Sequence, residues 1–388
     1  MFKTLKDFDF KGKAALVRCD FNVPLDEKGG ILNDFRIKQS LPTIDYLLKQ
    51  KAKIVLMSHL RRPKGKVVEG LRLDKVRDRL AKYLGVSVDK ADDCVSEEVK
   101  DRAAKMRQGD VLLLENLRFH REEELNDDRF AKQLAELGDV YVNDAFGMCH
   151  RAHASIVGPP KYLPSCAGLL LEREVKVLSR VLDKPWRPLV VVVGGAKIDS
   201  KTDVLERFLK SADHVLVGGQ VANVMMQAKG IIVGRPSLEP ELAKKIEKID
   251  LTSPKLHLPV DGVITLESRQ ENYSRIGGIG DVRKEESVFD IGPETIKVFA
   301  EIIKEAKMIL WAGPLGMFEE KQFEKGTKEV GQSIARNHSA FKVAGGGDTH
   351  EALIKFNLAD KFDHVSTGGG AMLEFVSGKK LPGLEALK

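Results

Sequence analysis

The chain has 388 residues, of which 43% are hydrophobic and 31% charged, an ordinary composition for a soluble enzyme of two or three domains. Its net charge is +6, but aromatic residues make up only 6% and no basic stripe with interleaved aromatics predicts nucleic-acid binding. The first ten residues are charged throughout and no apolar run approaches the length of a membrane span, so we expect neither a signal peptide nor a membrane helix. Four scattered cysteines without a CxxC pair indicate a reduced, cytoplasmic protein.

The first half alternates short apolar runs with helical patterns. The predicted strands are residues 14–17, 53–57, 111–114 and 140–142, and the predicted helices are residues 37–48, 73–84 and 129–137. Such alternation is typical of a parallel sheet covered by helices. Residues 165–182 are predicted to form one long helix, which the proline-containing segment 183–188 breaks, so we place a domain boundary there.

Polar side chains gather at the carboxyl ends of these strands, where a parallel sheet binds its ligands. Asp20 and Asn22 follow the first strand, and basic residues lie at or just past the strand ends: Arg18, Arg36, His59, Arg62, Arg118, Arg151 and His153. Each arginine alone is compatible with a surface salt bridge. Their shared position favours a pocket for a small anion, because a guanidinium binds carboxylate or phosphate with two parallel hydrogen bonds. His150 and His153 lack a third metal ligand, so we expect neutral histidines.

The second half repeats a different unit, an apolar strand that ends in glycine. The five strands end at Gly194, Gly218, Gly313, Gly345 and Gly368. Glycine lets the backbone approach a ligand closely, so five such ends at one sheet edge predict a cradle for a polyphosphate. Lys197 and Lys201 lie in the first turn of the helix after the first unit, where ammonium groups are unfavourable unless an anion binds there. The alternative is that the glycines only form tight turns.

An anion pocket and a phosphate cradle together indicate phosphoryl transfer between a nucleotide and an anionic acceptor. Glu319 is a candidate for binding ribose hydroxyls, and Asp348 for Mg²⁺, which binds few carboxylates beside phosphate oxygens. The P-loop, protein-kinase and dinucleotide-binding classes are excluded, because the chain lacks GxxxxGK[ST], HRD, DFG and a GxGxxG after a strand.

Along nearly its whole length the sequence resembles the phosphoglycerate kinases. The matching motifs are RCDFNVP (18–24), SHLRRP (58–63), ENLRF (115–119), NDAFGMCHRAHAS (143–155), GGAKIDSK (194–201), WAGPLGMFE (311–319), GGGDT (345–349) and STGGGA (366–371). The resemblance implies a reaction of glycolysis and gluconeogenesis, the reversible transfer of the acyl phosphate of 1,3-bisphosphoglycerate to ADP with Mg²⁺, giving 3-phosphoglycerate and ATP. A non-catalytic nucleotide-binding pseudoenzyme is the alternative; the complete set of basic residues argues against it.

The resemblance also implies residue roles. Substrate binding is expected from Asp20, Asn22, Arg36, His59, Arg62, Arg118 and Arg151. Nucleotide binding is expected from Lys197, Lys201, Gly219, Glu319, Gly346, Gly347, Asp348 and Thr349, with Asp348 also the metal ligand. Catalytic roles on the moving phosphoryl group are expected for Arg36, Lys201 and Gly369. No general base is needed, because the acceptor carboxylate is already ionised at neutral pH.

The resemblance implies an α/β fold of two doubly wound parallel-sheet (Rossmann-like) domains facing across a hinged cleft, in a monomer. Residues 1–170 would bind 3-phosphoglycerate, with the tail 377–388 docking back onto them. Residues 171–185 would form the interdomain helix and hinge, and residues 186–376 would bind the nucleotide. The chain departs from the family pattern at Arg61 (usually Gly), Ala312 (usually Asn) and Met148-Cys149 (usually Thr-Ala).

Overall fold

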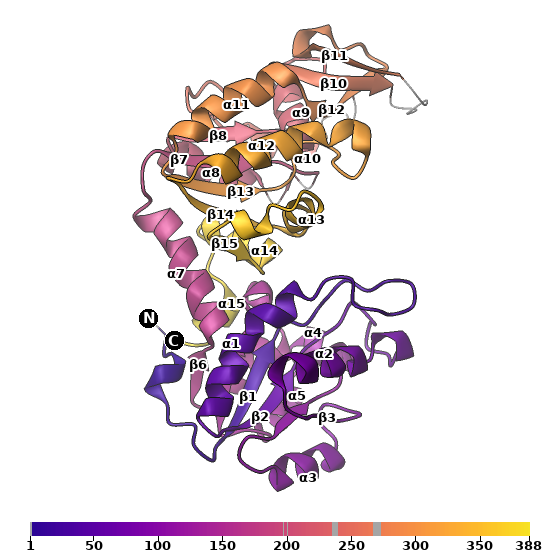
Figure 1. Cartoon of the computed structure of the whole chain (residues 1–388), viewed down its shortest axis with the longest axis vertical. Coiled ribbons are helices and arrows are strands. Elements are labelled where there is room, and N and C mark those ends of the chain that lie inside the picture. The colour runs from indigo at the N-terminus through magenta and orange to yellow at the C-terminus, as the bar shows by residue number, and fades with distance from the viewer. Residues whose placement is uncertain (1, 197, 200, 235–239, 267–272) are drawn as a thin grey trace. The chain divides into compact units, whose positions relative to one another are not determined.

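The computed structural model describes residues 2–196, 198–199, 201–234, 240–266 and 273–388. Contacts divide the chain into two units, Met1–Lys176 with Lys380–Lys388, and Val177–Lys379. The division falls within helix α7 (Leu169–Asp183). Each unit contains a six-stranded sheet whose paired strands are all parallel (Figure 1), which confirms the predicted α/β class with two parallel-sheet domains.

The sheet of the first unit has the strand order β3-β4-β2-β1-β5-β6. Its strands are β1 (Ala14–Cys19), β2 (Lys53–Met57), β3 (Val88–Lys90), β4 (Val111–Leu113), β5 (Val140–Asp144) and β6 (Ser165–Ala167). Its helices are α1 (Phe35–Lys49), α2 (Asp74–Leu84), α3 (Glu97–Lys105), α4 (Arg121–Leu125), α5 (Asp128–Ala135), α6 (Ala154–Val157) and the C-terminal α15 (Pro382–Glu385). The four predicted strands are confirmed. The two edge strands β3 and β6 have three residues each and were not predicted.

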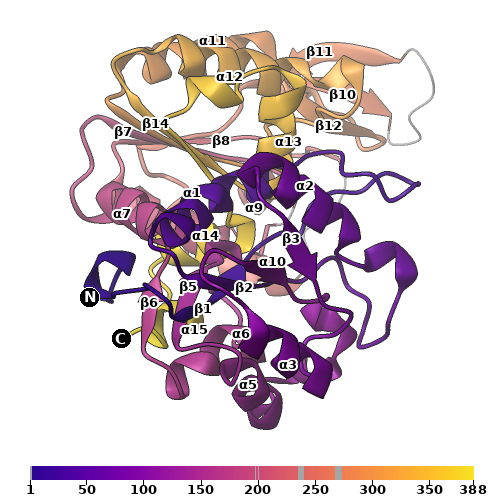
Figure 2. The ribbon, with the colours of Figure 1, turned by 60° about the horizontal axis from the view of Figure 1, so that its bottom comes forward.

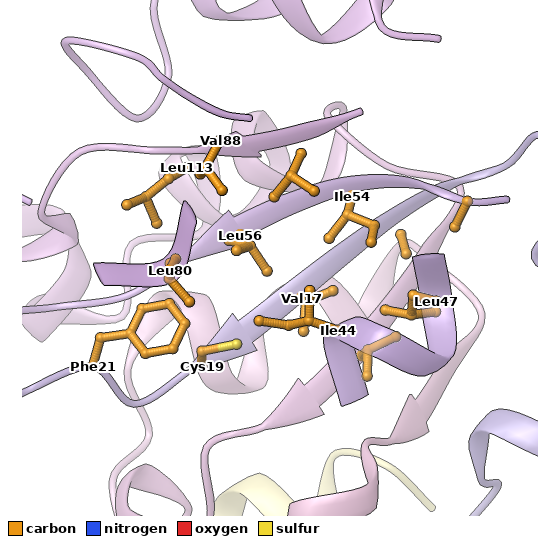
Figure 3. Close-up of a cluster of buried hydrophobic side chains, with 14 of the residues drawn as sticks. Val17, Cys19, Phe21, Ile44, Leu47, Ile54, Leu56, Leu80, Val88 and Leu113 are labelled. Carbon is orange, nitrogen blue, oxygen red and sulfur yellow. The ribbon is translucent and has the colours of Figure 1, made fainter. Parts of the chain in front are cut away.

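One face of this sheet forms a core with α1 and α2 (Figure 3). Side chains alternate between the two faces of a strand, so Val17 and Cys19 of β1 share this face with Leu56 of β2. They pack against Leu47 of α1 and Leu80 of α2, and all five residues are fully buried. Burying an aliphatic side chain of this size stabilises the fold by about 1.5–3 kcal/mol. The alternation also sends Arg18 to the opposite face.

The prediction of a single helix over residues 165–182 is wrong at its start. Ser165–Ala167 form β6, which pairs with β5, and Ala167 also forms a bridge to Thr4. The helix α7 begins at Leu169, after Gly168. The backbone partners of β6 come from distant parts of the chain, and their hydrogen bonds outweigh the local helical pattern.

The N-terminus of α7 is held by side chains of the first unit. Asp144 Oδ1 accepts hydrogen bonds from the backbone N–H groups of Leu170 (3.0 Å) and Leu171 (3.4 Å). Thr43 Oγ1 accepts one from Leu169 at 2.9 Å. These bonds satisfy the first amides of the helix, which have no partners within the helix itself. Asp144 is fully buried, and its burial raises the pKa of the carboxyl to about 8.

We expect Asp144→Asn to flatten the pH dependence of stability. The folded protein retains a proton on Asp144 up to about pH 8, whereas the unfolded chain releases it near pH 4. The contribution of the Asp144 carboxyl to the free energy of unfolding is therefore fully present below about pH 4 and is lost as the pH rises through about 8. Urea unfolding between pH 5 and 8 measures the effect, with the exposed Asp45→Asn as control. An Asp144→Asn protein with the wild-type pH slope would contradict the expectation.

The second unit has the strand order β15-β14-β13-β7-β8-β9. These strands are β7 (Leu189–Val193), β8 (His214–Val217), β9 (Leu256–His257), β13 (Met308–Ala312), β14 (Phe341–Gly345) and β15 (His364–Ser366). The five strands predicted to end in glycine are thus consecutive neighbours, as expected. A separate antiparallel sheet, not predicted, contains β10 (Asp261–Leu266), β11 (Ser274–Gly278) and β12 (Glu286–Ile291).

The helices of the second unit are α8 (Thr202–Ser211), α9 (Gly219–Ala228), α10 (Pro240–Ile246), α11 (Pro293–Glu305), α12 (Lys325–Arg336), α13 (Gly347–Lys355) and α14 (Gly369–Val376). Figure 2 shows α11 and α12 along the sheet. Trp311 and Val192 lie in the core with Phe299 of α11 and Val330 of α12, and all four are buried. In the described part of the chain, no helix has the length and apolarity that a membrane crossing requires.

Candidate active site

Four of the predicted substrate-binding residues are connected by hydrogen bonds at the carboxyl ends of β1 and β2. Asp20 is buried, and its Oδ2 accepts a hydrogen bond from Arg36 at 2.7 Å. Asn22 Oδ1 accepts the backbone N–H of Arg61 at 2.9 Å, and the carbonyl of Arg61 accepts a hydrogen bond from Arg118 at 2.8 Å. Asn22, Arg61 and Arg118 thus form one chain of hydrogen bonds. The structure brings these predicted side chains together as a group.

The Arg118 guanidinium retains capacity for an anion. It is only 6% exposed, and burial with the nearby Arg18 and Arg151 lowers its pKa, although Glu124 opposes this. Its Nε lies 3.2 Å from Glu124 Oε1 but makes no hydrogen bond among the described residues. The Glu124 carboxylate is half exposed and is not hydrogen-bonded to this Nε, so a carboxylate or phosphate could bind the guanidinium in its place.

His59 lies among arginines and is neutral. It is 2% exposed, and its Nδ1 is 3.3 Å from the Arg18 guanidinium. Burial lowers the pKa of His59 well below its usual value, and the charges of Arg18, Arg118 and Arg36 lower it further. Burial together with Arg151 also lowers the pKa of His150, to about 4. For His150, this shift fits the expectation of a neutral histidine.

Arg18 does not lie where the sequence predicted it, at the strand end in the anion pocket. It lies within β1, fully buried, with its Nε donating to Ser155 Oγ at 2.8 Å and its guanidinium 3.8 Å from Glu123. Glu123, on α4, also accepts hydrogen bonds from the backbone N–H and the hydroxyl of Ser155 at 2.8 and 2.7 Å. Arg18 is therefore an internal partner of Glu123, and sequence reasoning missed Glu123 because three adjacent glutamates resemble a solvated helix face.

Two predicted residues remain at the surface of the first unit. Arg62 and Arg151 are both exposed. The charge of Arg151 lowers the pKa values of both Arg118 and His150, so it lies beside the buried group. Arg62 directly follows Arg61, whose backbone is part of the hydrogen-bond chain.

Arg61 has a left-handed backbone, with φ of +57°. A side chain in this conformation costs roughly 1–2 kcal/mol, which glycine avoids. Glycine loses more entropy on folding, so we expect Arg61→Gly to stabilise the protein by a net ~0.5–1 kcal/mol. Thermal or urea unfolding measures this. Arg61→Ala is the matched control, because it removes the same charge but keeps the strained Cβ; equal effects of both variants would assign the gain to charge instead.

In the second unit, the glycine turns lie so close together that they exclude side chains. A Cβ atom at Gly194 would lie 2.0 Å from the carbonyl oxygen of Pro314, and one at Gly313 would lie 2.1 Å from that of Gly194. Gly219, the first residue of α9, has a φ of +61°, and a Cβ there would lie 3.0 Å from the amide of Gly195. The turns after β7, β8 and β13 therefore form one continuous backbone surface.

Two more helix N-termini, those of α13 and α14, lie beside each other. A Cβ at Gly369 would be 3.5 Å from the amide of Gly347, whereas one at Gly347 would meet open space. Gly346 caps α13 with a φ of +113°, which favours glycine. Thr349 is buried; its hydroxyl accepts the N–H of Gly313 at 2.7 Å and donates to Gly345 at 3.0 Å. Its hydroxyl thus ties the ends of β13 and β14 together. N-termini of this kind attract anions.

Lys201 precedes α8 as its N-cap residue and is 7% exposed. Its Nζ lies 3.4 Å from the carbonyl oxygen of Ala312, the last residue of β13. The ammonium is therefore held at the glycine-lined edge of the sheet. The other predicted lysine, Lys197, lies outside the described residues.

A cavity of about 480 Å³ opens beside this edge, within the size range of small-molecule sites. It contains the predicted Gly219, Glu319 and Asp348, of which the two carboxylates are exposed. Sequence reasoning missed a second group of lining residues: Gln220, Asn223, Ser287, Val288, Phe289 and Met317. Three of them belong to β12, which the local pattern did not reveal. Val288, Phe289 and Met317 give the cavity an apolar wall, and Gln220, Asn223 and Ser287 add polar groups.

The loop that carries Glu319 is fastened at several points. Thr327 Oγ1 accepts the N–H groups of Leu315 (3.0 Å) and Gly316 (3.2 Å), and Asp290 Oδ2 accepts that of Gly326 (2.6 Å). Lys355 Nζ donates to the carbonyl of Phe318 at 2.6 Å, directly before Glu319. These contacts hold the loop in one conformation beside the cavity.

One unit thus offers a group of arginines suited to a small anion, and the other offers backbone N–H groups, a lysine and a cavity suited to a nucleotide. This combination defines a two-domain phosphotransferase. The chain belongs to the phosphoglycerate kinase family, whose profile matches residues 5–379. It is therefore a phosphoglycerate-kinase-type phosphotransferase, and nothing in the described residues favours the non-catalytic alternative.

Known relatives and solved structures agree with this membership. The phosphoglycerate kinase of Pelotomaculum thermopropionicum is 47% identical over 389 residues, covering 99% of this chain and 98% of the relative. That of Dictyoglomus turgidum is 45% identical over 388 residues, with the same coverage. The phosphoglycerate kinase structure from Coxiella burnetii has a TM-score of 0.86 at 38% identity, covering 100% of this chain and 99% of that one. That from Pyrococcus horikoshii has a TM-score of 0.88 at 33% identity, covering 100% and 98%.

Proposed function

We propose that the chain transfers the acyl phosphate of 1,3-bisphosphoglycerate to ADP, reversibly, and that the arginine group of the first unit binds the phosphoglycerate. The observation that carries the assignment is the hydrogen-bond chain from Asn22 through Arg61 to Arg118, beside the Arg36–Asp20 pair. It fixes polar groups around the Arg118 guanidinium, whose Nε pairs with Glu124 without a hydrogen bond. His59, being neutral, would donate or accept a hydrogen bond without adding charge. Arg62 and Arg151 would complete the binding of the carboxylate and phosphate.

The nucleotide would bind in the cavity of the second unit. The N-termini of α9, α13 and α14 would hold the phosphates through Gly219, Gly347 and Gly369. The exposed carboxylate of Glu319 would accept hydrogen bonds from ribose hydroxyls, and the wall that includes Phe289 would cover the base. Lys201, with Lys197 beside it in sequence, would neutralise charge on the phosphates.

A Mg²⁺ ion fits the carboxylates of this cavity. Burial raises the pKa of Glu351, and the charges of Asp348 and Glu319 raise it further, so negative charge accumulates here. A divalent cation would relieve this repulsion, and Asp348, in the first turn of α13, would hold it. When bound, Mg²⁺ would neutralise phosphate charge.

The activity is tested by a coupled assay of ATP-dependent phosphorylation of 3-phosphoglycerate. Turnover by the purified, folded chain is expected, and Arg118→Ala should raise the KM for 3-phosphoglycerate far more than that for ATP. The control is Arg102→Ala, a surface residue of α3 that pairs with Asp89. No turnover by folded wild-type protein would refute the proposal.

Transfer requires the two bound substrates to meet, so we expect the units to approach each other when both are bound. Small-angle X-ray scattering should give a smaller radius of gyration with 3-phosphoglycerate and a non-hydrolysable ATP analogue together than with either alone. The extrapolated forward scattering should correspond to a monomer of 43.0 kDa, in keeping with a cytoplasmic monomeric enzyme. An unchanged radius with both ligands would contradict the closing movement.

A further inference from the structure

Three potential metal ligands meet in the first unit, apart from the residues assigned to phosphoglycerate. Asp93 and Cys94 follow β3, and His120 follows the short 3-10 helix η3 (Leu117–Phe119). A carboxylate oxygen, the thiol sulfur and a ring nitrogen all lie within 4.8 Å of one another. His120 Nε2 is 2.6 Å from Asp93 Oδ1, and Cys94 Sγ donates to the carbonyl of Glu115 at 3.1 Å.

This donor set matches the preferences of zinc. Zn²⁺ binds thiolate, imidazole and carboxylate, with bonds of about 2.0–2.3 Å in tetrahedral geometry, so its ligand atoms lie about 3.3–3.5 Å apart. The imidazole and the carboxylate, whose nearest atoms are 2.6 Å apart, would need to move apart to admit the ion. The side chains of His120 and Asp93 are 27% and 41% exposed, which leaves an entry path and room for water as a fourth ligand.

Cys94 supplies the buried ligand of the three. Its side chain is completely buried, so the sulfur lies at the inner end of the group, whereas the side chains of His120 and Asp93 reach solvent. Zn²⁺ binds the thiolate form of cysteine. On binding, the thiol and any protonated His120 would release their protons to water.

We propose that Asp93, Cys94 and His120 bind one thiophilic divalent cation, Zn²⁺, with water as the fourth ligand. The ion would connect the segment after β3 to the end of η3. The inference stands independently of the assigned reaction, because it rests on three residues that the phosphoryl transfer does not use. A ligand that binds only the folded chain raises the unfolding temperature, so Zn²⁺ should stabilise this unit.

Cobalt substitution tests the site directly. We expect the full-length protein, stripped with a chelator, to take up one equivalent of Co²⁺ and to develop a thiolate-to-cobalt charge-transfer band with the visible bands of tetrahedral Co²⁺. Zn²⁺ should displace the Co²⁺ and raise the unfolding temperature. Cys94→Ser should abolish the charge-transfer band. His120→Gln, at a partly exposed position, should weaken Zn²⁺ binding by at least about 100-fold, since loss of even an outer partner of a ligand costs about 10–100-fold.

The matched controls are Cys166→Ser, a buried thiol in β6, and Asp92→Asn, an exposed neighbour of Asp93. Both should bind Co²⁺ as the wild type does. Absence of the band in the wild type, its persistence in Cys94→Ser, or unchanged affinity in His120→Gln would each overturn the proposal. Circular dichroism of each variant establishes that it is folded before the titration is interpreted.

Discussion

Replacing Lys201 with alanine should lower kcat by about 10²–10³-fold while leaving the affinities for ADP and 3-phosphoglycerate within a few-fold of wild type. Lys201 is 7% exposed and lies at the glycine-lined edge of the sheet, near the carbonyl of Ala312. In a water-poor site an ammonium group stabilises the charge on a transferring phosphoryl group more strongly than in solution. Its contribution should therefore appear mainly in the transition state.

Steady-state kinetics and calorimetric titration with ADP separate the two effects. Lys210→Ala is the matched control: Lys210 lies near the other end of α8, the helix that Lys201 precedes, but it is exposed and pairs with Glu206. It should retain wild-type kcat. A large rise in KM with kcat intact in Lys201→Ala would mean that this lysine binds the ground state only.

Replacing Glu123 with glutamine should destabilise the first unit by about 3–5 kcal/mol, because it leaves the buried guanidinium of Arg18 without a counter-charge. Glutamine keeps one oxygen to accept the backbone N–H of Ser155, and its amide N–H can donate to the Ser155 hydroxyl, so the change tests charge more than shape. Burial would raise the pKa of Glu123, but His153, Arg18 and Ser155 outweigh it and hold the pKa below its usual value. Its stabilising effect is therefore present above about pH 4 and lost as the pH falls further.

Urea unfolding at pH 7 and at acid pH measures this loss and its pH dependence. Glu122→Gln, an exposed neighbour on α4, should change stability by no more than about 0.5 kcal/mol. Combining Glu123→Gln with Arg18→Met should cost less than the sum of the single changes, because the unpaired charge is then absent. If the changes in the free energy of unfolding were fully additive in this double-mutant cycle, the two side chains would not be coupled.

The local patterns predicted much of the fold. The residues of β2 and the C-terminal end of α2 at Gly85, which has a φ of +66°, agree with the sequence prediction. The five glycine-ended strands were also visible, because strand period and glycine turns depend on residues within a few positions of one another. The edge strands β3 and β6 were not predicted: two of the three residues of β3 are charged, and the residues of β6 were assigned to the helical pattern that follows them.

The sequence likewise predicted only some of the residues of the candidate site. The motifs identified the glycines, Glu319 and Asp348 as candidates, but not the wall from β12, nor the Thr327 and Asp290 contacts that hold the loop of Glu319. The contacts of Thr327 join residues 11 and 12 positions apart, and that of Asp290 spans 36 positions, so no local spacing reveals them.

The sequence alone determined the class of fold, the alternation of strands and helices, and the kinds of side chain at the strand ends, because these depend on short-range pattern and residue chemistry. Only the tertiary structure decided which of those side chains serve the site. Arg18 and Arg118 both look like anion ligands in the sequence. Strand alternation turns Arg18 to the face where Glu123 lies, whereas Arg118 donates to the backbone of Arg61 in the group at the strand ends. The difference depends on partners more than 50 residues away in the chain, Glu123 for Arg18 and Arg61 for Arg118, which folding alone brings together.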